Sequence, residues 1–150
     1  MENESCFVCR KHSGDVPVPG GAIYEDDLVF ICHAGLFSEE AEHYLGHLFI
    51  ETRRHVPDLT GLSDEESAAI GLWIGRLSRA LKDALGVEHV YAFSIGDGVP
   101  HVHVHVIGRY PGAPEEYWGP KVDEWPDAPH GGVQALAETA VKIREALADV

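Results

Sequence analysis

The sequence predicts an α+β domain in which a mostly antiparallel sheet of five strands packs against two helices. Five short apolar or alternating runs indicate strands, and two longer stretches repeat apolar residues with the period of a helix. Their order, three strands, a helix, two strands and a final helix, is typical of the α+β class. With 45% hydrophobic and 24% charged residues, the chain has the composition of a single globular domain over residues 1–150.

The five predicted strands are short and are bounded by turn residues. Glu-Asp-Asp at 25–27 separates the first two strands, and Gly-Asp-Gly-Val-Pro at 96–100 separates the last two. The third strand precedes the first long helix. We expect the strands at 22–24, 28–33, 47–52, 89–95 and 101–109.

The first predicted helix is the clearest element of the sequence. Ser63 and Glu66 form a capping box at its start, and Gly86 is suited to end it as a C-cap. Between these ends, apolar residues recur at helical spacing, namely Ile70, Trp73, Ile74, Leu77, Leu81 and Leu85. A second amphipathic helix is expected over 133–148.

Composition and charge argue against several classes of function. No apolar run approaches the ~20 residues that span a bilayer, and the N-terminal segment is acidic where a secretory signal is basic and then apolar. We therefore expect a cytoplasmic protein without a membrane partner. The formal net charge of -14 repels nucleic acid, so no nucleic-acid partner is expected, and a phosphate ligand must be bound by local contacts.

The three cysteines are an odd number, which does not suit a disulfide framework. Cys6 and Cys9 form a Cys-x-x-Cys motif, which in a reducing compartment is either a metal-binding pair or a redox-active pair. Cys32 has apolar neighbours and is expected to be a buried residue of the second strand.

The motif that points most directly to chemistry is His-Val-His-Val-His-Val-Ile-Gly-Arg at 101–109. Successive side chains of a strand point to opposite faces, so the valines face a core while His101, His103 and His105 line the other face at steps of roughly 6.6 Å. A solvated strand face would be served equally well by Lys, Thr or Glu. Three alternating histidines therefore indicate a site, because imidazole is a nucleophile, a metal ligand and a group that titrates near neutral pH.

These residues resemble the signature of the histidine triad (HIT) family, His-φ-His-φ-His-φ-φ, in which φ is hydrophobic. The segment YLGHLFIETRRH, which contains His47 and His55, is similar to the family's segment of Gly-His, a strand and Lys-x-His. Cys-Phe-Val-Cys, followed later by AIYEDD, resembles the zinc-bearing bacterial branch of the family. The resemblance covers most of residues 6–110.

The resemblance implies a hydrolase or nucleotidyl transferase that acts on a nucleotide or a nucleotide conjugate. Such an enzyme cleaves a phosphoanhydride or phosphoramidate bond at the α-phosphate through a covalent nucleotidyl-histidine. By analogy, His103 is the nucleophile, and His105 and His47 support it. The candidate nucleotide-binding residues are His103, His105, Ser94 and Arg109.

A zinc ion is also implied by the resemblance. His55 and His101 would complete a Cys2His2 site with Cys6 and Cys9. Four protein ligands leave no open position for water, so the expected zinc ion is structural.

The resemblance further implies a homodimer. An open five-stranded sheet has two edges with unpaired backbone groups, which proteins must pair or cover. The family pairs two chains, and we expect residues around the long helix, including Trp73 and Leu72, in that interface.

Departures from the family pattern leave other functions open. The family's Gly-Gln-Ser/Thr-Val segment before the triad is replaced here by 98–100, and Ala34 or His33 stands where an acidic residue commonly binds the ribose. The alternatives are a nucleotide-binding regulatory module with little turnover and a metal-handling protein. Trp118 and Trp125 either pack against the C-terminal helix or cover the site.

Overall fold

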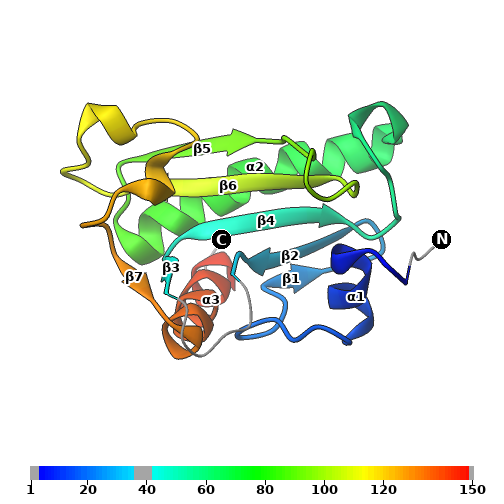
Figure 1. The fold of residues 1–150 in the computed structure, drawn as a ribbon, viewed down its shortest axis with the longest axis horizontal. Coiled ribbons are helices and arrows are strands. Elements are labelled where there is room, and N and C mark those ends of the chain that lie inside the picture. The colour runs from blue at the N-terminus through cyan, green and yellow to red at the C-terminus, as the bar shows by residue number, and fades with distance from the viewer. Residues whose placement is uncertain (1–3, 36–41, 149–150) are drawn as a thin grey trace.

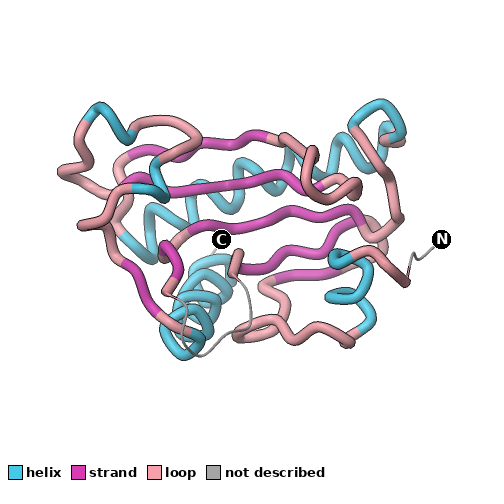
Figure 2. Tube along the Cα trace, in the orientation of Figure 1, coloured by secondary structure: helices cyan, strands magenta, loops and turns pink. Residues whose placement is uncertain are grey.

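The structure is a computed structural model, and it describes residues 4–35 and 42–148. Within these residues the chain forms three α-helices, an antiparallel five-stranded sheet in the order β1-β2-β4-β6-β5, and a small sheet of β3 and β7 (Figure 1). Figure 2 shows the same elements along the Cα trace. The predicted α+β class with a five-stranded antiparallel sheet is confirmed.

The bounds of the long elements agree closely with the sequence pattern. The strands are β1 (Tyr24–Glu25), β2 (Val29–His33), β3 (His43–Tyr44), β4 (His47–Thr52), β5 (His89–Phe93), β6 (His103–Arg109) and β7 (His130–Gly131). The helices are α1 (Phe7–Ser13), α2 (Asp64–Leu85) and α3 (Val133–Ala148). Among the α-helices and strands, α1, β3 and β7 were not predicted. The strand expected from residue 101 begins at residue 103, so His101 precedes it.

The main hydrophobic core lies between one face of the large sheet and the helices α2 and α3. The predicted alternation is observed, because Val104 and Val106 of β6 face this core together with Leu48 and Ile50 of β4. In Figure 1, α2 crosses behind the sheet. The core therefore occupies one face and leaves the other face of β4 and β6 for polar side chains.

Trp73 belongs to this core and not to the surface expected to form a dimer interface. Its side chain is 6% exposed, and its ring centroid lies 4.2 Å from that of Tyr24. Trp73 repeats at helical spacing with Ile70 and Leu77, which directs all three side chains toward the sheet. Leu72, one residue earlier on α2, is 51% exposed.

The predicted ends of α2 are confirmed. The Ser63 hydroxyl accepts a hydrogen bond from the backbone N–H of Glu66, whose carboxylate accepts one from the backbone N–H of Ser63. Gly86 ends the helix in the left-handed conformation, with φ of 70°. Among the described residues, no helix is long and apolar enough to cross a membrane.

The opposite face of the sheet carries polar and aromatic side chains. The register places Phe49 of β4 opposite His105 of β6, and Glu51 opposite His103. Helix α1 lies over one end of this face, as its contacts with Glu51 show, and residues 110–132 pack around Ile107 at the other end (Figure 1). This face therefore carries the side chains that could form a functional site.

Candidate functional site

A cavity of about 630 Å³ opens on the polar face of the sheet. This volume falls in the range that small-molecule sites commonly have. The floor comes from β4 and β6, one wall from α1, and another from the segment that follows β6. Its lining includes Lys11, Tyr44, His47, Phe49, Glu51, His103, Asp123 and His130.

The three histidines of the triad have three different environments. His101 is fully buried and faces α1, His103 lines the cavity, and His105 contacts His47. They do not form one metal cluster, because only His101 lies with the two cysteines of the motif. The segment 101–105 therefore contributes His101 to the cysteine and histidine cluster and His103 to the cavity.

The ring of His103 is held in one orientation. Its Nδ1 lies 2.7 Å from the backbone oxygen of His101, and because a carbonyl only accepts, Nδ1 carries the proton. In the neutral ring, Nε2 then has the lone pair. The Ser94 hydroxyl donates to the backbone oxygen of His103 at 3.2 Å. Ser94 thus binds the backbone of β6, and it is not among the residues that line the cavity.

His47 and His105 form a hydrogen-bonded pair beside the cavity, with Nε2 of His47 2.9 Å from Nδ1 of His105. Burial lowers the pKa of His47 to about 3 and that of His105 to about 4. Both rings are therefore neutral at pH 7, and one donates to the other. The His105 ring also stacks on Phe93, with centroids 4.6 Å apart.

Arg109 is on the same face as the histidines, but the structure does not bring it to them. Arg109 lies six positions further along β6 than His103, a distance of roughly 20 Å between their Cα atoms. Its guanidinium pairs with Glu88 at 3.2 Å, donates to the Tyr91 hydroxyl at 2.6 Å and lies over the Trp118 ring. Arg109 is therefore not placed to contact a phosphoryl group at His103.

The two tryptophans of the loop after β6 have different neighbours. Trp118 covers the Arg109 guanidinium at 3.8 Å from the ring centroid. Trp125 packs against a small hydrophobic cluster that contains Tyr44, Ile107 and Val122. Both rings therefore pack over the polar face of the sheet, beyond the histidines.

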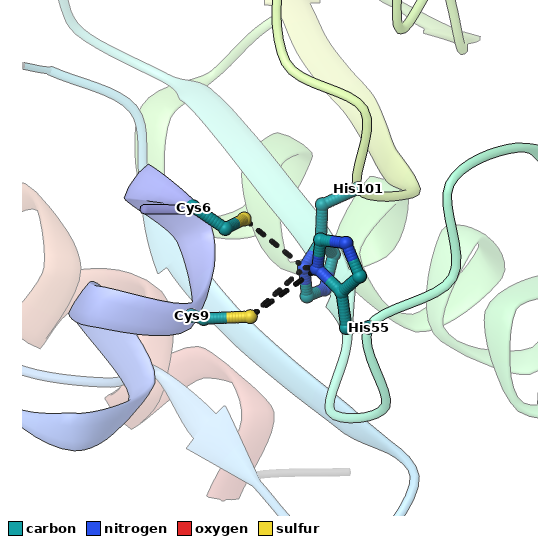
Figure 3. Close-up of side chains that lie close together, drawn as sticks. All are labelled: Cys6, Cys9, His55 and His101. Carbon is teal, nitrogen blue, oxygen red and sulfur yellow. Dashed lines mark hydrogen bonds between the residues drawn. The ribbon is translucent and has the colours of Figure 1, made fainter. Parts of the chain in front are cut away.

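The four predicted metal ligands come together although they are far apart in the sequence. Cys6 and Cys9 lie on α1 and its N-cap, while His55 and His101 come from loops, and all four point toward one another (Figure 3). Their ligand atoms all lie within 4.8 Å of one another. Nδ1 of His101 is 3.5 Å from Sγ of Cys6 and 3.2 Å from Nδ1 of His55.

These residues fit a zinc ion. Zinc–ligand bonds of 2.0–2.3 Å in a tetrahedron require ligand atoms about 3.3–3.8 Å apart, close to the distances observed. Nε2 of His101 donates to the Thr52 carbonyl at 2.6 Å, which leaves the Nδ1 lone pair facing the cluster. The three cysteines, all in the described part of the chain, form no disulfide, and Cys32 is fully buried as predicted.

A buried ion pair on the cavity wall was not predicted from the sequence. The Lys11 ammonium donates a hydrogen bond to the Glu51 carboxylate and forms an ion pair with it. The carboxylate also accepts a hydrogen bond from Nε2 of His12 at 3.1 Å. Burial favours neutral Glu51, but the bond to His12 and the charge of Lys11 outweigh it and hold the pKa of Glu51 below its ordinary value. The alternation of Glu51 with His47 on β4 was an available signal. The contact with Lys11 was not, because α1 was not predicted.

The chain is similar in sequence and in structure to proteins of one family. Residues 17–112, more than half of the chain, match the family model described as the HIT domain. No curated protein matches the chain.

Several solved structures share the fold. A Hit-like protein involved in cell-cycle regulation from Bartonella henselae, solved with an unknown ligand, has a TM-score of 0.73 at 19% identity and covers 96% of this chain and 97% of its own. A zinc-bound histidine triad family protein from Mycobacterium smegmatis has a TM-score of 0.70 at 24% identity, covering 97% and 94%. A hypothetical histidine triad nucleotide-binding protein from Sulfolobus tokodaii has a TM-score of 0.73 at 17% identity, covering 96% and 93%.

The triad motif, the α+β fold and the extent of the family match lead to one conclusion. The chain belongs to the HIT family.

Proposed function

We propose that this HIT protein is a nucleotide hydrolase or nucleotidyl transferase whose nucleophile is His103. The observation that carries the proposal is the orientation of the His103 ring on the cavity wall. Its Nδ1–H is held by the His101 carbonyl, which leaves the Nε2 lone pair as the reactive atom. A preformed orientation of this kind shortens the search for a productive geometry.

The proposed reaction has two displacements at the α-phosphorus. In the first, Nε2 of His103 forms a P–N bond while the P–O or P–N bond to the leaving group breaks, and the leaving group takes that electron pair. In the second, water or another acceptor forms a new bond to phosphorus and releases its proton to solvent, and the imidazole leaves with its electron pair. Division of one hard displacement into two easier steps is the advantage of covalent catalysis.

His105 and His47 are proposed to act as a neutral hydrogen-bonding pair next to the reacting phosphorus. With pKa values of about 4 and about 3, they do not compete with the substrate for protons at pH 7. One N–H of the two neutral rings is used in the bond between them, and the other remains to donate to an oxygen on which negative charge develops.

We infer that Cys6, Cys9, His55 and His101 hold one structural zinc ion. When bound, such an ion supplies a fixed anchor for its four ligands and no chemistry of its own. His101 is one of these ligands, and its backbone carbonyl orients the His103 ring. The cluster thus positions the nucleophile two residues away.

Mass spectrometry of the intact chain tests the proposed nucleophile. The protein is mixed with a panel of dinucleoside polyphosphates, nucleoside phosphoramidates and sugar nucleotides and quenched within seconds. We expect an added mass of one nucleoside monophosphoryl group. His103→Ala removes this adduct and lowers turnover by several orders of magnitude, because the nucleophile is lost. The control His89→Ala changes an exposed histidine of β5 and keeps both adduct and turnover.

Two results would contradict this function. One is turnover by His103→Ala within about threefold of the unmodified protein. The other is the absence of both an adduct and turnover with every substrate of the panel while nucleotides bind, which would instead indicate a nucleotide-binding module.

A further inference from the structure

The buried pair of Lys11 and Glu51 lies on the wall of the cavity that contains His103. Lys11 is 9% exposed and Glu51 is 1% exposed, yet both line the cavity. Burial of two opposite charges costs desolvation energy that their attraction often only just offsets, so apolar residues would serve the fold equally well. A charged pair at this place indicates a role in ligand binding.

The pair is close to the proposed nucleophile. Glu51 is the direct cross-strand partner of His103, and side chains in such pairs have their Cβ atoms roughly 5 Å apart. The Lys11 ammonium bonds the Glu51 carboxylate and lies 5.1 Å from the centroid of the Phe49 ring. That ring packs against the His103 ring, with centroids 5.4 Å apart. A phosphoryl group that reaches His103 therefore lies near Lys11.

The charge of the cavity shows why this ammonium ion matters. Among the described residues that line the cavity, Lys11 is the one lysine or arginine, whereas three carboxylates, Glu42, Glu51 and Asp123, are present. The whole chain has a formal net charge of -14. A phosphate anion must overcome this field, and a charged donor in direct contact is the strongest local compensation.

The ammonium group of Lys11 also has one N–H that is not used by Glu51 or Cys32. It carries three N–H groups, and its polar partners in the described part of the chain are the Glu51 carboxylate and the Cys32 sulfur at 3.7 Å. Glu51 is held in turn by Nε2 of His12 at 3.1 Å. The carboxylate therefore fixes the position of Lys11, and one N–H remains for a ligand in the cavity.

We propose that Lys11 is a phosphate-binding residue, whose ammonium ion contacts the phosphoryl oxygens of a nucleotide placed for attack by His103. Glu51 is the positioning residue that holds this ammonium ion against the cavity. This inference rests on the proposed function, and it adds a residue of α1, which also carries Cys9, to the phosphate site.

Replacing Lys11 and Glu51 together distinguishes an effect on ligand binding from an effect on stability. Lys11→Met alone leaves the Glu51 carboxylate buried without its cation, so loss of stability is expected for a structural reason alone. Lys11→Met with Glu51→Gln removes both charges together and is expected to keep a melting temperature near that of the unmodified protein. The control Lys142→Met makes the same change at an exposed position of α3.

Binding is measured by calorimetry with AMP, GMP, CMP and UMP and with the matching nucleosides. For the mononucleotide that binds most tightly, we expect the double variant to weaken binding tenfold or more, because a charge-assisted hydrogen bond is lost. The matching nucleoside should bind within twofold of its original affinity, since it lacks the phosphate. Lys142→Met should change neither value.

The outcomes distinguish this inference from the function on which it rests. A stable double variant that binds the mononucleotide as tightly as the unmodified protein overturns the role of Lys11. It does not affect the proposed role of His103 as nucleophile. An unmodified protein that binds no mononucleotide overturns the role of Lys11, while the adduct on His103 decides the proposed function separately. If the double variant does not fold, Lys11→Gln, which keeps a hydrogen bond to Glu51 without the charge, is measured by the same criteria.

Discussion

A single buried residue can be held by a complete set of hydrogen bonds, and His33 at the end of β2, on the same face of the sheet as Leu48 and the core, is an example. Its Nδ1 donates to the Ala34 carbonyl at 2.6 Å, and its Nε2 accepts from the backbone N–H of Gly46 at 3.0 Å. Both ring nitrogens are therefore used by the neutral form. His33 stands at or beside the position where the family pattern has an acidic residue for the ribose. Here the histidine instead connects the end of β2, through a hydrogen bond, to Gly46 just before β4.

The neutral state of His33 predicts a pH dependence of stability. Burial lowers its pKa from 6.5 to about 4, so between these values the unfolded chain binds a proton that the folded chain does not. The free energy of unfolding should therefore fall as the pH drops from about 6.5 to about 4, by about 3 kcal/mol from this residue. Urea unfolding at several pH values measures the slope.

A matched pair of variants isolates this contribution. His33→Gln should flatten the slope by about one proton in this pH window, whereas His89→Gln, at an exposed position of β5, should leave the slope unchanged. An identical slope for His33→Gln and the unmodified protein would show that His33 titrates normally in the folded state.

At the scale of elements, α1 depends on its contacts with the rest of the molecule. It has seven residues and no side-chain cap at its start, and an isolated helix of this length is not stable in water. The cysteine and histidine cluster holds its first turn, and the pair of Lys11 with Glu51 holds its end. The position of α1 is therefore set by the cluster of Cys6, Cys9, His55 and His101 and by the sheet.

Metal removal should accordingly loosen α1. Protein purified without chelator should contain about one zinc ion per chain, and Cys9→Ser should lower both the zinc content and the melting temperature, by roughly 10 °C, because zinc binding is coupled to folding. Metal analysis and calorimetry give the two values. Cys32→Ala, which changes the cysteine outside the cluster, should keep its zinc. A metal-free protein with full thermal stability would contradict this assignment.

The elements also show what a sequence can and cannot predict. The periods of β4, β6 and α2 are long enough to be recognised, and the alternation on β6 correctly separated core valines from histidines. Helix α1 has too few residues for a period, and β3 and β7 have two residues each. The pair of Lys11 and Glu51 depends on strand register and on the position of α1, neither of which one sequence supplies.

At the scale of the whole molecule, we predict a homodimer of about twice the 16.4 kDa chain mass. Leu72 of α2 is 51% exposed, whereas Trp73 is buried in the core of its own chain. Leu72 is therefore the side chain of these two that can contact a second chain. Sedimentation at micromolar concentration should show a dimer for the unmodified chain and a shift toward monomer for Leu72→Glu. Leu59→Glu, also at an exposed position, should remain dimeric. A monomeric unmodified protein would refute the dimer and leave the histidine chemistry unaffected.

The separation of the metal ligands along the chain has a consequence for protein synthesis. Cys9 precedes His101 by 92 residues, so at typical rates of translation the cysteine is made roughly 5–20 s before the histidine. During that interval the growing chain has two thiols and no complete set of four ligands. All four ligands of the proposed zinc ion are therefore present only after residues 1–101, about two thirds of this sequence, have been made, and complete capture of the metal must follow that point.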